Sequence, residues 1–343
     1  TVMIITDILR AMIVLGFLFV DEAHELPLLY GLLFAQMSVG IFFDAARSAS
    51  VPNTIAKEDL QIAYTLSAAT WSIMLALGAG LGGLLLNAVG LAGVFIIDAA
   101  TYLVSAVFVV WLRLPSTPAP KAPLHWADIF LLRDIRRAIE HLREREALHF
   151  ALVKCFWGAC GGFVVMISII GKVRFAPLFG SDTAAAGLAT SLLYMARGVG
   201  TGIGPVLARR FSGGSDKALL RQIFAGYFIG ASGYALLAPL ESFPLALAAI
   251  VLAHCGGSAL WVASTTGWQR KIDDSLRGRS FSFEFILLHI SFTIGAAITG
   301  AIYDSTGSIE QATWITCAAV IIGGITWRIL AARIMASSPQ IKA

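Results

Sequence analysis

Four ionisable side chains stand out as candidates within long apolar runs of the 343-residue sequence: Arg197, His254, His289 and Asp98. A charge at the centre of a membrane helix costs roughly 2.5–3.5 kcal/mol on insertion scales, so such residues usually have a function. A buried arginine can bind an anion such as a carboxylate or catecholate, or it can pair with a carboxylate on a neighbouring helix. The histidines could carry a proton near neutral pH, or they could be hydrogen-bonded interior residues.

Three tryptophans, Trp71, Trp157 and Trp261, lie inside or at the ends of apolar runs of the same kind. Aromatic side chains in a cavity offer a broad apolar surface to organic solutes. The alternative is that these rings anchor helices at the membrane interface or pack against lipid. Glu284 and Arg279 near one end of an apolar run could pair as a gate, or form an exposed ion pair.

No enzymatic constellation occurs in the sequence. It contains no Gly-Lys-Ser/Thr phosphate loop, no HExxH and no GxSxG motif, and the glycine-rich Gly198–Gly204 lies inside an apolar run. The cysteines lack metal-site spacing and are expected to be small buried residues; they are Cys155, Cys160, Cys255 and Cys317. We therefore expect no enzyme, metal or cofactor.

The apolar runs predict an all-α polytopic membrane protein. Mean hydropathy is +0.79 and only 13% of residues are charged, against roughly 25% in soluble proteins. Runs of about 20 residues match the length of a helix that crosses a bilayer. We predict ten spans, near residues 2–20, 27–45, 67–87, 91–112, 150–171, 184–208, 219–239, 243–263, 282–303 and 312–331.

Lysine and arginine are concentrated in every second gap between these runs, as in the region from Arg113 to Lys154. This pattern indicates that the basic gaps face the cytoplasm. It predicts a multi-pass protein of the cytoplasmic (inner) membrane, with both Thr1 and the C-terminal tail inside. Lys172 and Arg174 break the pattern and could attract anions in an outer loop. The basic residues are spread over separate loops, so the net charge of +4 does not indicate nucleic-acid binding.

The long gap at 113–149 is predicted to be a cytoplasmic linker. A proline-rich stretch is followed by apolar residues at helical spacing with Arg and Glu between them. That spacing favours an amphipathic helix on the inner membrane face, the alternative being a solvated linker.

The two halves of the chain contain an internal repeat. A constant offset aligns Gly78–Gly83 with Gly295–Gly300, and the same offset pairs Gly90 with Gly307. Parallel repeats of this kind are a transporter architecture.

Several stretches resemble the major facilitator superfamily, and most closely its bacterial efflux branch of enterobactin-exporter-like and macrolide-efflux-like permeases. They are 43–52, 60–72, 95–102, 134–142 and 276–281. Asp44 and Arg47 belong to the first of these stretches, and Arg277 and Arg279 to the last. The resemblance places them in cytoplasmic loops, and it places Arg197 on a cavity-lining helix and Asp98 on a peripheral one.

Two motifs depart from the family pattern. Gly78, Gly82 and Gly83 resemble its antiporter motif, with Gly295 and Gly300 in the repeat, but Ala79 replaces the usual proline. These glycines can equally be a helix-packing face. Arg209 fits the cytoplasmic loop motif, but Ala208 stands where aspartate is usual, and Arg209 can instead bind anionic headgroups.

The resemblance implies twelve helices in two lobes, of which the chain would hold ten, four plus six, without the first two. The expected organisation is an incomplete N-terminal lobe at 1–112, the linker at 113–149 and a six-helix lobe at 150–343. The implied function is secondary export of small organic molecules by alternating access, with protons as the coupling ion and a monomer in the lipid bilayer. The alternatives are a non-transporting scaffold or sensor, and a lipid facilitator of the same fold.

Overall fold

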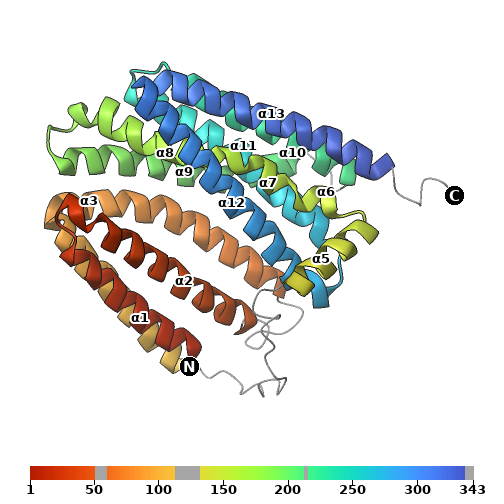
Figure 1. Ribbon diagram of the computed structural model, residues 1–343, viewed down its shortest axis with the longest axis horizontal. Helices are drawn as coiled ribbons and strands as arrows, with labels where there is room; N and C mark the ends of the chain where they lie inside the picture. Colours follow the sequence, from red (N-terminus) through yellow and green to blue (C-terminus); the bar gives the residue numbers. More distant parts are fainter. Residues whose placement is uncertain (51–59, 113–131, 212–214, 337–343) are drawn as a thin grey trace. The chain divides into compact units, whose positions relative to one another are not determined.

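The computed structural model describes residues 1–50, 60–112, 132–211 and 215–336, and its regular elements there are all helices (Figure 1). The predicted all-helical fold class is therefore confirmed. Contacts divide the chain into two compact units. The first unit comprises Thr1–Trp71 and Leu81–Lys121, and the second comprises Ser72–Gly80 and Ala122–Ala343.

The first unit is built from three long helices: α1 (Val2–Gly16), α2 (Leu26–Ser50) and most of α3 (Leu60–Trp111). Short 3₁₀ turns at Phe17–Phe19 and Ala23–Glu25 join α1 to α2. Small residues Ala11 and Ala99 let α1 approach α3, and the Phe17 and Phe95 rings meet beside them at 5.4 Å. This contact brings the polar side chains of α1 and α3 together inside the unit.

Gly90 and Gly307, which the sequence repeat pairs, both have a positive φ but differ in ψ, which is 178° at Gly90 and 3° at Gly307. Gly90 divides the long helix α3 with φ of 69°, and Gly307 ends α12 (Asp274–Thr306) with φ of 63°. Residues with a Cβ rarely adopt a positive φ, so glycine is favoured at both positions. Only Gly307 has the left-handed helical conformation that is common at the end of a helix. The two positions share a preference for glycine but not a backbone conformation, so the repeat stays a prediction.

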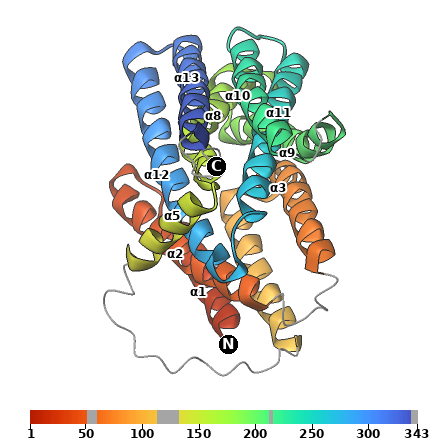
Figure 2. The ribbon, with the colours of Figure 1, turned by 90° about the vertical axis from the view of Figure 1, so that its right-hand side faces the viewer.

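Beyond its Ser72–Gly80 segment of α3, the second unit contains α5 (Leu132–Glu144) and a broken membrane helix. The broken helix consists of α6 (Leu148–Ala151), α7 (Val153–Trp157), a 3₁₀ turn η5 (Gly158–Cys160), α8 (Gly161–Ile169), a π-helical turn η6 (Ile170–Phe175) and a 3₁₀ turn η7 (Ala176–Leu178). The remaining helices are α9 (Thr183–Phe211), α10 (Asp216–Leu237), α11 (Phe243–Gln269), α12 and α13 (Ile309–Ala336). Helix α11 packs between α9 and α10, and α12 runs beside α13 (Figure 2).

Seven segments of the described chain are long and apolar enough to cross a membrane. The predicted spans 67–87 and 91–112 fall within the single element α3, on either side of Gly90. The spans predicted at 184–208 and 219–239 correspond to α9 and α10, which are not among the seven. The count of ten spans therefore stays a prediction.

Helix α5 lies within the predicted linker and is tied to the second unit. Its Leu142 is fully buried in the core of that unit. Asp273, just before α12, accepts a hydrogen bond from Arg145 at 3.3 Å, and its carboxylate lies 3.5 Å from His141. The end of α5 is thereby fixed to the turn between α11 and α12.

Glycines at the break between α7 and α8 let α12 approach closely. A Cβ added at Gly161 would collide with the backbone carbonyl oxygen of Phe292, and one added at Gly295 would lie 2.9 Å from Ala159 Cα. We expect Gly161→Ala to lower the thermal unfolding temperature by several degrees, because overpacking costs about 1–3 kcal/mol. Gly300→Ala is the matched control, since nothing lies within 4 Å of its added Cβ. Equal unfolding temperatures for both variants would contradict the packing argument.

Candidate functional site

Arg197 lies in the middle of α9, and its guanidinium has no anionic partner among the described residues. Its Cζ lies 5.7 Å from the ring centroid of Tyr194, and its Nε is buried with no hydrogen-bond partner. The ion pairs found in the described ranges do not include Arg197. Burying an uncompensated charge is costly. An anionic ligand would remove that cost, because a guanidinium offers several donors to carboxylate oxygens.

A histidine and a tyrosine on neighbouring helices complete this group, which we call the Arg197 cluster: Arg197, Tyr194, Tyr234 and His254. The Tyr234 hydroxyl and His254 Nε2 are 2.7 Å apart, and the Tyr234 ring stacks on Phe163 at 3.7 Å. Arg197 interacts electrostatically with both Tyr234 and His254. His254 is thus a hydrogen-bonded interior residue that also lies in the field of Arg197.

The close approach of α9 and α11 positions this cluster. A Cβ on Gly200 would meet Val251 O at 2.5 Å and His254 Cβ at 2.9 Å, and a Cβ on Gly204 would meet the backbone of Cys255. The glycine-rich segment Gly198–Gly204 is therefore a helix-packing face, as expected from its place inside an apolar run.

A second charged group joins α7, α11 and α12. Lys154 Nζ lies 2.8 Å from Glu284 Oε2 and donates to Thr265 Oγ1 at 2.9 Å. Glu284 Oε1 accepts the indole N–H of Trp268 at 3.1 Å. Lys154 also lies over the ring of Trp261 at 4.2 Å. Both charged residues have 0% exposure, so the pair is sealed from solvent on all sides.

This pair corrects two sequence-based assignments. The charge count groups Lys154 with the basic cytoplasmic linker, but Lys154 is enclosed in a helix of the second unit. Glu284 was expected to meet Arg279 or to form an exposed pair, whereas its partner in the structure is Lys154. The side chains of Arg277 and Arg279 lie outside the described residues. The sequence did contain a signal for this pair, because Lys154 lies in an apolar run that also contains a tryptophan. That signal was not used.

The other cavity candidates have different surroundings. Trp157 is 7% exposed and packs in the core of the second unit, where its ring meets Tyr227 at 5.6 Å. Trp71 is 60% exposed on α3. His289 is exposed on α12 and its Nδ1 lies 2.7 Å from Phe285 O in the preceding turn. Trp261 belongs to the Lys154 group.

The glycine and loop candidates have varied surroundings. Among the antiporter-like glycines, Gly295 faces backbone of the 3₁₀ turn η5, while a Cβ at Gly78, Gly82 or Gly300 meets nothing within 4 Å. Gly83 is buried. The role of this motif stays a prediction.

The predicted cytoplasmic loop residues are exposed where their side chains are described. Asp44 and Arg47 form a solvent-facing pair at 3.8 Å, and Arg209 is exposed at the end of α9. Exposed pairs of this kind contribute little stability.

Arg174, which breaks the charge pattern, has a structural role. Its guanidinium donates to the carbonyl oxygen of Ala238 at 2.6 Å and to that of Leu240 at 3.2 Å. These carbonyls follow the C-terminal end of α10, where backbone oxygens lack helical partners. Arg174 therefore caps a helix, which removes part of the reason to expect an anion there.

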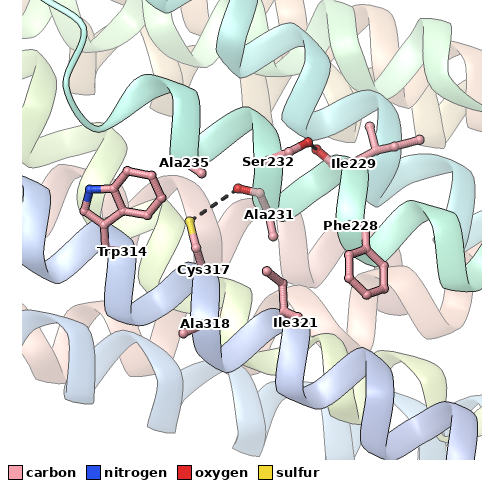
Figure 3. A pocket seen from close by; sticks show the side chains of 9 residues that line it. All are labelled: Phe228, Ile229, Ala231, Ser232, Ala235, Trp314, Cys317, Ala318 and Ile321. Atoms are coloured by element: carbon pink, nitrogen blue, oxygen red, sulfur yellow. Dashed lines mark hydrogen bonds between the residues drawn. The ribbon is translucent and has the colours of Figure 1, made fainter.

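The described residues also contain an apolar groove of about 450 Å³ between α10 and α13 (Figure 3). Figure 3 shows Cys317 directed at the carbonyl oxygen of Ala231, which its thiol reaches at 3.3 Å. No carboxylate, ammonium, guanidinium or imidazole group lines the groove, and no group of three metal-ligating side chains occurs in the described ranges. The charged chemistry of this unit thus lies in the Arg197 cluster and the Lys154–Glu284 pair.

Comparison with known proteins identifies the family. The sequence profile of the Major Facilitator Superfamily matches residues 1–283. YkuC, an uncharacterized MFS-type transporter of Bacillus subtilis (strain 168), is 25% identical over 306 residues, which cover 84% of this chain and 67% of YkuC. BacE of Bacillus amyloliquefaciens, a proposed bacilysin exporter, is 27% identical over 305 residues, which cover 87% of this chain and 71% of BacE.

Solved structures show the same fold at lower sequence identity. A bacterial homologue of the human lysosomal transporter Spinster, in an inward-facing and occupied conformation, gives a TM-score of 0.65 at 14% identity, covering 98% of this chain and 84% of that one. The E. coli fucose:proton symporter FucP gives 0.55 at 17% identity, covering 95% and 82%. With a profile match over more than half of its length, the chain belongs to the Major Facilitator Superfamily of membrane transporters.

Proposed function

We propose that this transporter exports a small organic molecule bearing a carboxylate or a similar anionic group. The observation that carries the proposal is the half-buried side chain of Arg197, whose buried Nε has no hydrogen-bond partner and whose guanidinium has no counterion among the described residues. An arginine that binds a carboxylate with two parallel hydrogen bonds gains both affinity and orientation. The hydroxyl of Tyr234 and the ring of His254 add polar groups that can recognise a second part of the same molecule.

Relatives support export as the direction of transport. BacE proteins are named as bacilysin exporters, and a second BacE, of Bacillus subtilis (strain 168), is 38% identical over 120 residues, 34% of this chain. The resemblance to the efflux branch favours the same direction. Bacilysin is therefore the first probe to test, as a representative of the proposed substrate class.

The mechanism we propose is alternating access driven by a proton gradient. The protein would work as a monomer in the cytoplasmic membrane with its C-terminal tail inside. The alternation of basic loops supports this orientation. Intramembrane ionisable groups in both units supply candidates for proton binding.

The test uses the full-length protein in proteoliposomes with radiolabelled bacilysin as the probe. An imposed pH gradient should drive accumulation above that of protein-free liposomes, and a proton ionophore should abolish it. Accumulation insensitive to the ionophore would contradict proton coupling. Movement of a fluorescent phospholipid without bacilysin transport would favour the lipid facilitator instead, and the absence of both would favour the scaffold or sensor.

A further inference from the structure

The first unit contains a polar group inside its membrane-spanning helices to which the proposed function assigns no particular residue role. Five residues from three helices form it: Asp7 and Arg10 on α1, Gln36 on α2, and Tyr102 and Ser105 on α3. We call it the Asp7 cluster. The segments that carry it, Val2–Phe19, Leu26–Asp44 and Ile73–Trp111, are apolar enough to cross a membrane.

Asp7 is the sealed acid of the cluster. It is 1% exposed, and its Oδ2 accepts a hydrogen bond from Ser105 Oγ at 2.7 Å. The ion pairs of the described chain do not include Asp7. An ionised carboxylate in this position lacks direct compensation, and the membrane makes such a charge costly.

Arg10 is held close to Asp7 without pairing to it. Its Nη2 donates to Tyr102 Oη at 2.8 Å, and its Cζ lies 4.3 Å from the centroid of the Tyr102 ring. Gln36 also donates to Tyr102 Oη, at 3.1 Å. Two polar atoms of this arrangement, Arg10 Nε and Gln36 Oε1, are buried without partners. The Nε–H of Arg10 is therefore free to donate a hydrogen bond to a carboxylate.

Charge balance in the cluster also favours proton binding. Arg10 is on the same helix as Asp7 and acts electrostatically on both Asp7 and Asp98, which faces it from α3. Among the described residues, the polar groups of the cluster other than Asp7 and Arg10 are neutral, and so is Thr6, which bonds to Met3 O on its own helix; Ser105, Tyr102 and Gln36 are described above. Two carboxylates thus share one guanidinium, so one excess negative charge remains unless one carboxyl binds a proton.

We propose that Asp7 binds and releases the coupled proton of this transporter. This inference rests on the proposed function, because it assigns the proton step of that transport cycle. In the loaded form a proton from the aqueous phase converts the Asp7 carboxylate to a neutral acid, and Arg10 stays on Tyr102. On release the proton returns to water, and the free Nε–H of Arg10 provides the countercharge. Asp98 is exposed, whereas a coupling site must be closed to water between proton binding and release; Asp7 is the acid that is enclosed.

The first test needs no substrate. Infrared difference spectra of the full-length protein, recorded on lowering the pH, should show the carbonyl stretch of a protonated acid that shifts when aspartate is labelled with carbon-13. Asp7→Asn should remove this signal, and Asp98→Asn should keep it. In Asp7→Glu the signal should persist but no longer respond to labelled aspartate, which keeps the test decisive if Asp7→Asn folds poorly. A label-sensitive signal that survives in either Asp7 variant would overturn the proposal.

The second test separates coupling from substrate binding, with bacilysin as the probe. In Asp7→Asn proteoliposomes, uptake driven by a pH gradient should fall to the level of protein-free liposomes, while exchange of labelled for unlabelled bacilysin continues. Loss of both activities in a folded variant would assign Asp7 a structural role and overturn the proposal. If wild-type protein does not transport bacilysin but the infrared signal depends on Asp7, the substrate assignment fails and the assignment of Asp7 stands.

Discussion

Replacing Lys154 by methionine, or Glu284 by glutamine, is expected to lower the free energy of unfolding by about 3–5 kcal/mol, because either change leaves one buried charge without its partner. The pair is 2.8 Å apart and sealed, so water cannot solvate the remaining charge. Unfolding by SDS in mixed micelles measures the loss. Lys217→Met is the control: Lys217 is exposed in the first turn of α10, and surface changes usually stay within about 0.5 kcal/mol.

The double variant Lys154→Met/Glu284→Gln distinguishes a charge effect from a packing effect. It removes both charges, retains the apolar stem of Lys154, and leaves an amide oxygen to accept the indole N–H of Trp268. We expect it to be more stable than either single variant, since replacing a buried ion pair as a whole is often neutral. If the double variant lost as much unfolding free energy as the two single variants together, the two charges would not interact, contrary to the geometry.

Sequence periodicity was sufficient to predict the helical class and several helix ends. The turn at Gly90 followed from a short polar gap and a glycine, and the structure places that glycine at φ of 69°. The equivalent Gly307 could be inferred because the same offset links it to Gly90. Both predictions depended on where glycine occurs at the end of an apolar run, which can be read directly from the sequence.

The candidate sites were less accessible from the sequence, because partners come from distant helices. Lys154 and Glu284 are 130 residues apart, and Asp7 and Ser105 are 98 apart. Arg197 could be singled out, with His254, His289 and Asp98, because a charge in an apolar run is visible in the sequence without knowledge of its neighbours. By contrast, Lys154 lies next to a basic linker, so its charge was counted with that linker, and Arg174 looked like a loop charge although it caps α10.

Arg197→Gln is expected to weaken transport of a carboxylate-bearing probe, because hydrogen bonds to a charged group contribute about 1.5–3 kcal/mol. That energy corresponds to a loss of roughly tenfold to more than a hundredfold in apparent affinity. Bacilysin exchange in proteoliposomes, measured over a range of concentrations, gives this number. Arg197→Lys should recover only part of the affinity, since an ammonium cannot reproduce the two parallel bonds of a guanidinium. Arg221→Gln, an exposed position on α10, is the control.

A neutral analogue of the probe makes the role of Arg197 specific. With bacilysin converted to its carboxamide, wild-type protein and Arg197→Gln should show equal affinity, because the interaction that the substitution removes is absent from both. A variant that weakens the acid and the amide equally would indicate that Arg197 supports the packing of α9, and the anion site would be ruled out. An effect confined to the acid would place the substrate carboxylate at the unpartnered guanidinium.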